Sequence, residues 1–139
     1  FWQENVTAQP VVTWRGLAFE HVCFNHIPQI KKALGISGVI TSASAWSKRE
    51  DDQEGTQIDL LLTRNDNVLN MCEIKYYGGK YTVKKDDYLT LLGRQELLMS
   101  KVSPKMTIRS TLITTFGLTQ NEYSGVFTNV ITLDDLFAE

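Results

Sequence analysis

The sequence predicts an α/β or α+β domain with a mixed sheet, and two observations support this fold class. The chain has 139 residues, of which 42% are hydrophobic and 22% charged, values that are ordinary for one folded domain. Its periodic segments follow one another in the order helix, three strands, helix, and one or two further strands. This order is typical of a sheet that packs against helices.

The N-terminal part is predicted to contain a lead-in segment and a helix. Residues 1–13 show little periodicity, so we expect them to lead into a single domain over residues 14–139. A helix is predicted over residues 14–34. Pro28 should interrupt this helix, because proline fits poorly in a helix interior, and Gly35 should end it.

The other elements follow from residue type and from turn signals. Three strands are predicted next, over residues 38–46, 56–64 and 68–77. The turn-forming residues Asn65, Asp66 and Asn67 separate the last two, which should therefore form a hairpin. The remaining predicted elements are a helix over 83–102, a strand over 108–116, a weaker strand over 126–132 and a short helix over 133–138. Thr132 is the expected cap of the last helix.

Charge, cysteine spacing and hydropathy exclude several classes of protein. A net charge of −2 excludes a strongly basic nucleic-acid binder, although it is compatible with a local basic patch. Cys23 and Cys72 lie far apart, so we expect neither a disulfide framework nor a zinc site, and a reducing cytosol is favoured. No apolar stretch approaches the roughly 18 residues of a spanning helix, so no membrane association is expected. Because the first residue is Phe1 rather than Met, we expect a piece cut from a longer chain.

The residues that indicate chemistry are Asp59 on the second predicted strand and Glu73 and Lys75 on the third. Side chains alternate along a strand, so Glu73 and Lys75 point to the same face. If the hairpin turn is centred on Asp66, a three-residue loop places Asp59 directly opposite Glu73. A two-residue loop would place Asp59 opposite Ile74 instead. The site hypothesis therefore depends on the register of the hairpin.

Two adjacent carboxylates repel each other unless a cation lies between them, and Mg²⁺ or Mn²⁺ with oxygen ligands meets this need. We expect Asp59 and Glu73 to hold the ion, with the backbone carbonyl of Ile74 as a third oxygen and Lys75 beside it. This arrangement suits phosphodiester hydrolysis, because a metal activates water and a neighbouring ammonium group stabilises charge on the phosphate. The alternative is a surface ion pair, against which the apolar character of the strands argues. The crowding also predicts that Glu73→Gln stabilises the metal-free fold.

A third carboxylate, Glu20, falls within an apolar stripe of the first helix. Leu17, Cys23, Phe24 and Ile27 all lie within about 60° of it on a helical wheel. If this stripe packs on the sheet, Glu20 reaches the metal site as a ligand or beside one. The alternative is that Glu20 lies near the helix start, where the helix dipole favours a negative charge.

Two further sets of residues are weaker candidates. Gln95 falls within an apolar face of the second long helix, where it either supports the site or pairs within the core. The loop that leaves Lys75 interleaves cations with tyrosines, which suits contact with phosphates and unstacked bases; a plain surface loop is the alternative. Its candidate nucleic-acid-binding residues are Tyr76, Lys80, Tyr81, Lys84 and Lys85.

These residues together resemble a known superfamily. Glu20, the run Gly55-Thr56-Gln57-Ile58-Asp59 and the run Cys72-Glu73-Ile74-Lys75 are similar to the motifs of PD-(D/E)XK nucleases, which have the restriction-endonuclease-like fold. More narrowly, residues 14–20, the GTQIDLL and CEIKYY runs and residues 133–137 resemble the C-terminal domain of a group of bacterial and archaeal AAA-type ATPases.

The resemblance implies an αβββαβ core whose mixed sheet is flanked by helices. It implies metal ligation by Asp59 and Glu73, a catalytic role for Lys75, and supporting roles for Glu20 and Gln57. The implied activity is that of a Mg²⁺-dependent deoxyribonuclease that hydrolyses DNA in the cytoplasm and acts with the ATPase module of the same longer chain. A non-cleaving nucleic-acid-binding or regulatory module of that ATPase is the alternative, and homo-oligomerisation is left open.

Overall fold

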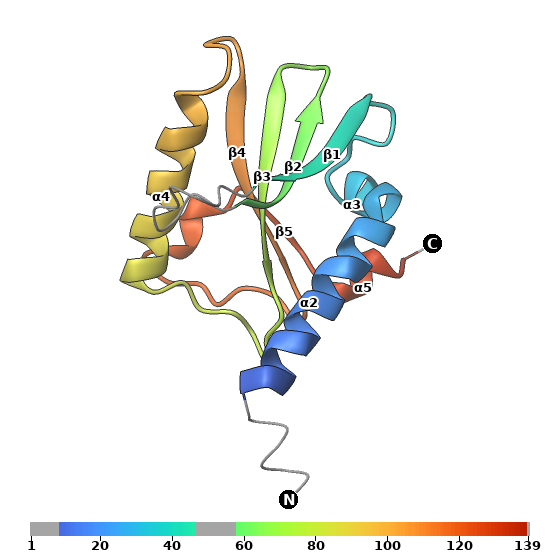
Figure 1. Cartoon of the computed structure of the whole chain (residues 1–139), viewed down its shortest axis with the longest axis vertical. Helices are drawn as coiled ribbons and strands as arrows, with labels where there is room; N and C mark the ends of the chain where they lie inside the picture. The colour runs from blue at the N-terminus through green and yellow to red at the C-terminus, as the bar shows by residue number, and fades with distance from the viewer. Residues whose placement is uncertain (1–8, 47–57, 139) are drawn as a thin grey trace, which may run out of the picture.

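The computed structural model of the chain describes residues 9–46 and 58–138, drawn in colour in Figure 1. The helices and the 3-10 turn are α2 (Gln9–Asn25), α3 (Ile27–Ala33), α4 (Lys85–Met99), η1 (Ser124–Val126) and α5 (Leu133–Leu136). The strands are β1 (Thr41–Trp46), β2 (Ile58–Arg64), β3 (Val68–Lys75), β4 (Thr107–Thr114) and β5 (Asn129–Ile131). The predicted order of elements is therefore confirmed, and the short turn η1 is an addition.

The five strands form one mixed sheet in the order β1-β2-β3-β4-β5. The pairs β1–β2 and β2–β3 are antiparallel, whereas β3–β4 and β4–β5 are parallel. The parallel pair β3–β4 needs a crossover, and α4 provides it. The fold is thus α+β with the expected αβββαβ order. No helix in the described ranges combines the length and the apolar character that crossing a membrane would require.

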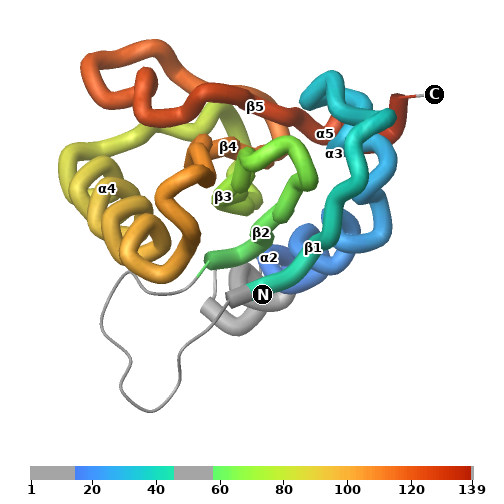
Figure 2. The backbone as a smooth tube through the Cα atoms, turned by 90° about the horizontal axis from the view of Figure 1, so that it is seen from above, coloured from blue at the N-terminus to red at the C-terminus, as the bar shows by residue number. Residues whose placement is uncertain are grey.

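Helices cover both faces of the sheet (Figure 1, Figure 2). One apolar cluster lies under α2, α3 and α5 and consists of Phe19, Cys23, Ile30, Leu60, Leu62, Cys72, Ile74, Ile113, Ile131 and Leu136. The other lies under α4 and consists of Ile58, Leu69, Met71, Val83, Leu91, Leu98, Leu112 and Phe127. Consecutive residues of β3 alternate between the two clusters, because successive side chains of a strand point to opposite faces.

The N-terminal helix differs from its prediction in extent and in orientation. It begins at Gln9, inside the segment predicted as a lead-in, and ends at Asn25, so the break falls before Pro28. Pro28 instead lies in the first turn of α3, where proline is tolerated because its missing N–H has no partner in the helix. The buried face also differs from the predicted stripe, because Leu17 and Phe24 are exposed (59% and 37%).

The hairpin of β2 and β3 has the predicted three-residue loop, Asn65 to Asn67. Leu60 pairs with Cys72, which is the register that a turn centred on Asp66 gives. Asn67 has a φ of 66°, the left-handed conformation that such a loop requires. The predicted register of the hairpin is therefore confirmed for the pairs from Leu60–Cys72 to Thr63–Leu69, which end one residue short of Asp59.

A bulge lies in β2 beside the candidate site. Ser44 of β1 pairs with Leu61, whereas Trp46 pairs with Ile58, so one β1 residue opposes both Asp59 and Leu60. Accordingly Ile58 and Leu60, two positions apart, pack in different apolar clusters. A bulge bends a strand and changes the direction of its side chains, and it does so here at Asp59.

Candidate active site

Asp59 lies on β2, and its carboxylate turns towards β3. Its Oδ2 accepts a hydrogen bond from the backbone N–H of Ile74 at 3.0 Å. Burial raises the pKa of Asp59 and the charge of Glu73 raises it further, whereas the Ile74 N–H and the cations Lys75 and Arg94 lower it. The structure therefore brings Asp59 and Glu73 close enough for their charges to act on each other.

Glu73 on β3 is almost fully buried, with 6% of the residue exposed, and it binds two cations. Its Oε2 accepts a hydrogen bond from Arg94 Nη1 at 2.5 Å, and its Oε1 lies 3.3 Å from Lys75 Nζ. Lys75 is thus beside Glu73, as predicted, while Arg94 of α4 is an addition to the predicted site. A buried carboxylate requires such partners, because its burial without compensation would be costly.

Glu20 of α2 faces the same group of charges. Burial raises the pKa of Glu20, and the charges of Asp59 and Glu73 raise it further, whereas Lys75 lowers it. Glu20 is only partly buried, so it lies at the margin of the helix face that packs on the sheet. The carboxylates of Glu20, Asp59 and Glu73, which come from α2, β2 and β3, therefore all interact electrostatically with Lys75. The predicted apolar stripe around Glu20 was nevertheless partly wrong.

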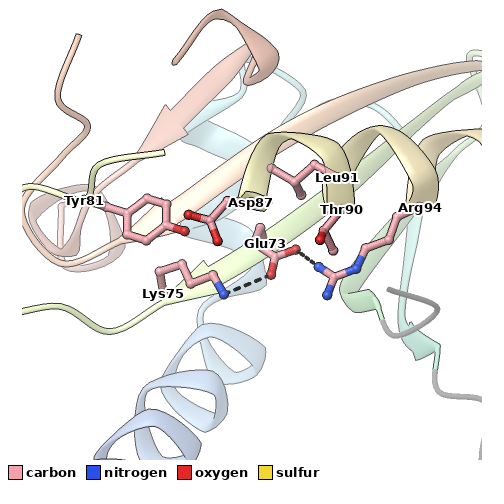
Figure 3. Close-up of a pocket in the computed structure, with 7 residues that line it drawn as sticks. All are labelled: Glu73, Lys75, Tyr81, Asp87, Thr90, Leu91 and Arg94. Atoms are coloured by element: carbon pink, nitrogen blue, oxygen red, sulfur yellow. Dashed lines mark hydrogen bonds and ion pairs between the residues drawn. The ribbon is translucent and has the colours of Figure 1, made fainter. Parts of the chain in front are cut away.

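A polar pocket of about 70 Å³ opens between β3 and the first turns of α4. Glu73 lies at its centre, with Lys75 on one side and Arg94 on the other (Figure 3). The residues that line it are Glu73, Lys75, Tyr81, Asp87, Thr90, Leu91 and Arg94.

Tyr81 and Asp87 join this pocket to the start of α4. Burial raises the pKa of Tyr81, and the negative charges of Asp87 and Glu73 raise it further. Tyr81 and Asp87 both line the pocket (Figure 3). Asp87 Oδ2 accepts the backbone N–H of Lys84 at 3.1 Å and so caps α4. These contacts fix the first turn of α4 beside the carboxylates.

The donor set suits a hard cation in part. Among residues 9–46 and 58–138, no three His, Cys, Asp or Glu side chains converge closely enough to form a complete metal-binding group. Asp59 and Glu73 nevertheless offer carboxylate oxygens, which are ligands that a hard divalent cation prefers. Burial, and after it the neighbouring negative charges, raise the pKa values of Asp59 and Glu20. Ile74 contributes through its N–H, and a ligand role for its carbonyl stays a prediction.

The predicted nucleic-acid-binding loop is anchored at one tyrosine and exposed elsewhere. Tyr81 is hydrogen-bonded through its backbone to Gly117 and Thr119 beyond β4, so the end of the loop is held beside the sheet. The other predicted residues, Tyr76, Lys80, Lys84 and Lys85, are exposed. The ring of Tyr76 lies against Phe19, at 5.7 Å between centroids.

Other predicted residues lie in the core or outside the described residues. Gln95 Nε2 donates to Ser110 Oγ on β4 at 2.5 Å, so this amide satisfies a buried hydroxyl rather than a site residue. Gln57 lies outside the described residues. Cys23 and Cys72 are buried free thiols, as expected, and burial raises the pKa of Cys23 to about 12.

Sequence reasoning missed Arg94, although a signal was present. Arg94 follows Leu91 by three positions and precedes Leu98 by four, so it shares the buried face of α4 with them. A cation inside an apolar stripe needs a buried anion as its partner. The same argument that singled out Glu20 on the first helix would therefore have identified Arg94 on the second.

Comparisons with known proteins assign no family to the chain. No protein family matches it, and no curated protein is similar enough to match. Among solved structures it is similar to the crystal structure of a protein of unknown function, AF1548, with a TM-score of 0.49 and 14% identity over 79% of this chain. The chain spans 56% of the length of that protein.

Proposed function

We propose that this chain is a metal-dependent endonuclease domain that hydrolyses DNA phosphodiester bonds with Mg²⁺ or Mn²⁺. In this proposal it belongs to the PD-(D/E)XK nucleases and acts in the cytoplasm with an ATPase module of a longer chain. The observation that carries the proposal is the position of Asp59 next to Glu73 and Lys75 at one end of the hairpin. Two carboxylates with an adjacent ammonium group are suited to holding a cation next to a phosphate.

Each residue of the site would have a separate role in hydrolysis. Asp59 and Glu73 would hold the cation, which when bound supplies positive charge that polarises the phosphate and lowers the pKa of a water. Lys75 would orient the attacking water or stabilise the charge that develops on the phosphate oxygens. Glu20 would accept a hydrogen bond from that water. The water oxygen would bond to phosphorus and lose a proton to solvent, while one P–O ester bond breaks and the leaving oxygen takes up a proton from solvent.

DNA contact would be local, because the net charge of −2 gives no general affinity for a polyanion. The exposed lysines Lys80, Lys84 and Lys85 follow the site in the chain and offer positive charge on the surface. Tyr76, also exposed, offers a ring on which an unpaired base can stack. We therefore propose that the β3–α4 loop binds the substrate strand next to the cleaved bond.

A second function is favoured by one specific contact. Both oxygens of Glu73 accept from cations, Oε2 from Arg94 and Oε1 from Lys75, as they would in a purely structural ion pair. In that alternative the domain binds nucleic acid or regulates the ATPase without cleaving. The two functions differ in whether the site binds metal and turns over.

A plasmid-nicking assay with Mg²⁺ or Mn²⁺ tests the proposal. Wild type should convert supercoiled plasmid to nicked circles, and Asp59→Ala and Lys75→Met should each reduce the rate by at least about a hundredfold. Asp134→Ala and Lys105→Met are matched controls at exposed positions and should cleave like wild type. Equal nicking by wild type and Asp59→Ala would indicate a contaminating nuclease and contradict the proposal, as would no nicking by any protein.

A further inference from the structure

The position of Arg94 suggests how metal affinity is controlled at the proposed site, an inference that rests on the function proposed above. We propose that Arg94 is the internal counter-cation of Glu73, with which a divalent cation must compete. Its Nη1 lies 2.5 Å from Glu73 Oε2, in the shorter of the two ion pairs of that carboxylate. Arg94 is thereby a positioning residue that acts through Glu73.

The surroundings of Arg94 keep it in this position. Its neighbours on the same face of α4, Leu91 and Leu98, are buried in the apolar cluster under the helix. Its own side chain is 17% exposed, against 39% for Lys75. The Arg94 contact is therefore less screened by water than the Lys75 contact, and the backbone of α4 cannot carry Arg94 away without disrupting the core.

Arg94 also lines the pocket that holds Glu73. Its guanidinium lies on the side of Glu73 opposite Lys75 (Figure 3). A divalent cation between Asp59 and Glu73 would be repelled by this fixed positive charge. Arg94 thus stabilises Glu73 when metal is absent and weakens metal binding, so the site should require a high concentration of free cation or the added negative charge of a substrate phosphate.

The decisive measurement is the affinity of the 139-residue chain for Mn²⁺ without DNA, by isothermal titration calorimetry. Arg94→Gln removes the charge and should bind Mn²⁺ roughly tenfold more tightly than wild type. Arg94→Lys keeps the charge and should stay within about threefold of wild type. Arg109→Gln, which removes an exposed arginine on β4, is the matched control and should leave the affinity unchanged. A merely structural role of Arg94 predicts unchanged or weaker binding by Arg94→Gln.

The outcomes separate this inference from the proposed function. If Arg94→Gln binds Mn²⁺ more tightly than wild type, and adding Asp59→Asn abolishes this binding, both the inference and the proposed function are supported. If Arg94→Gln binds Mn²⁺ and wild type does not, the role of Arg94 is supported more strongly. Binding by wild type that Arg94→Gln does not strengthen overturns the inference and leaves the nuclease proposal standing. No binding by any variant overturns both. If Arg94→Gln does not fold, NMR of the Arg94 guanidinium in wild type decides: its signals should shift as Mg²⁺ is titrated, and unchanged signals at saturation overturn the inference.

Discussion

The backbone N–H of Ile74 on β3 donates a hydrogen bond to Oδ2 of Asp59 on β2, at 3.0 Å. This bond joins a side chain of one strand to the backbone of the next, so the position of Asp59 depends on the pairing of the two strands. The bulge in β2 falls at the same residue. The bulge and the hydrogen bond together place this carboxylate beside β3, where the charge of Glu73 acts on it.

We expect Asp59→Asn to stabilise the metal-free protein. The amide oxygen still accepts the Ile74 N–H, while the change removes a charge that burial and Glu73 disfavour. The melting temperature measured by differential scanning fluorimetry with a chelator should rise by about 3 °C. Asp134→Asn, at an exposed position, is the control, and its melting temperature should not be higher than that of wild type. A lower melting temperature for Asp59→Asn would show that the charge itself holds the fold.

The same carboxyls predict a pH dependence of stability. The pKa values of Asp59 and Glu20 are raised above their ordinary values of 3.8 and 4.5, so the folded state binds more protons than the unfolded state as the pH passes above these values. The slope of the unfolding free energy with pH is then negative, and the stability from these groups is lost as pH rises from about 4 through the raised pKa values.

Urea unfolding of wild type and Asp59→Asn between about pH 4 and pH 7 measures this effect. Other carboxyls have the opposite influence: Arg64 lowers the pKa of Asp66, for example. The informative quantity is therefore the difference between the two proteins, which should grow in favour of Asp59→Asn as pH rises. A difference that is constant over this range would contradict the raised pKa of Asp59.

We expect Glu73→Gln to destabilise the protein, although crowding of carboxylates alone predicts the reverse. The change removes the partner of Arg94 and of Lys75, and Arg94 would remain largely buried without its counter-charge. Breaking such a buried pair costs about 3 kcal/mol. Urea unfolding at neutral pH should show this loss, with a smaller loss for Lys75→Met because Lys75 is more exposed. Stabilisation by Glu73→Gln would mean that repulsion from Asp59 outweighs both ion pairs.

Much of the fold was predictable because its signals are local. The hairpin follows from alternating apolar residues on either side of Asn65, Asp66 and Asn67, and the last helix follows from Thr132, whose N–H donates to Asp135 Oδ2 at 2.9 Å. The face of the first helix was less predictable. Leu17 and Phe24 fit an apolar stripe, yet they are exposed. The helix instead packs on the sheet through the neighbouring face, which carries Phe19 and Cys23.

The candidate site was predictable where it depends on strand geometry and not where it depends on packing between elements. Glu73 and Lys75 share a face through alternation alone, and the register of the hairpin brings Asp59 to the level of Glu73 and Ile74 on the neighbouring strand. The pairing of Arg94 with Glu73 joins residues 21 positions apart through the docking of α4 on the sheet. The bulge at Asp59 depends on how β2 pairs with β1, and the sequence of β2 alone does not show this pairing.

The last prediction tests the hairpin register on which the site depends. Asn67 has a φ of 66°, a conformation that costs most residues about 1 kcal/mol and that glycine adopts freely. We expect Asn67→Ala to lower the unfolding free energy by about 1 kcal/mol and Asn67→Gly to leave it unchanged or slightly higher. Asn65→Ala in the same loop is the control, because Asn65 has no positive φ. Equal losses for both alanine variants would show that side-chain contacts, rather than the left-handed residue, stabilise the hairpin loop.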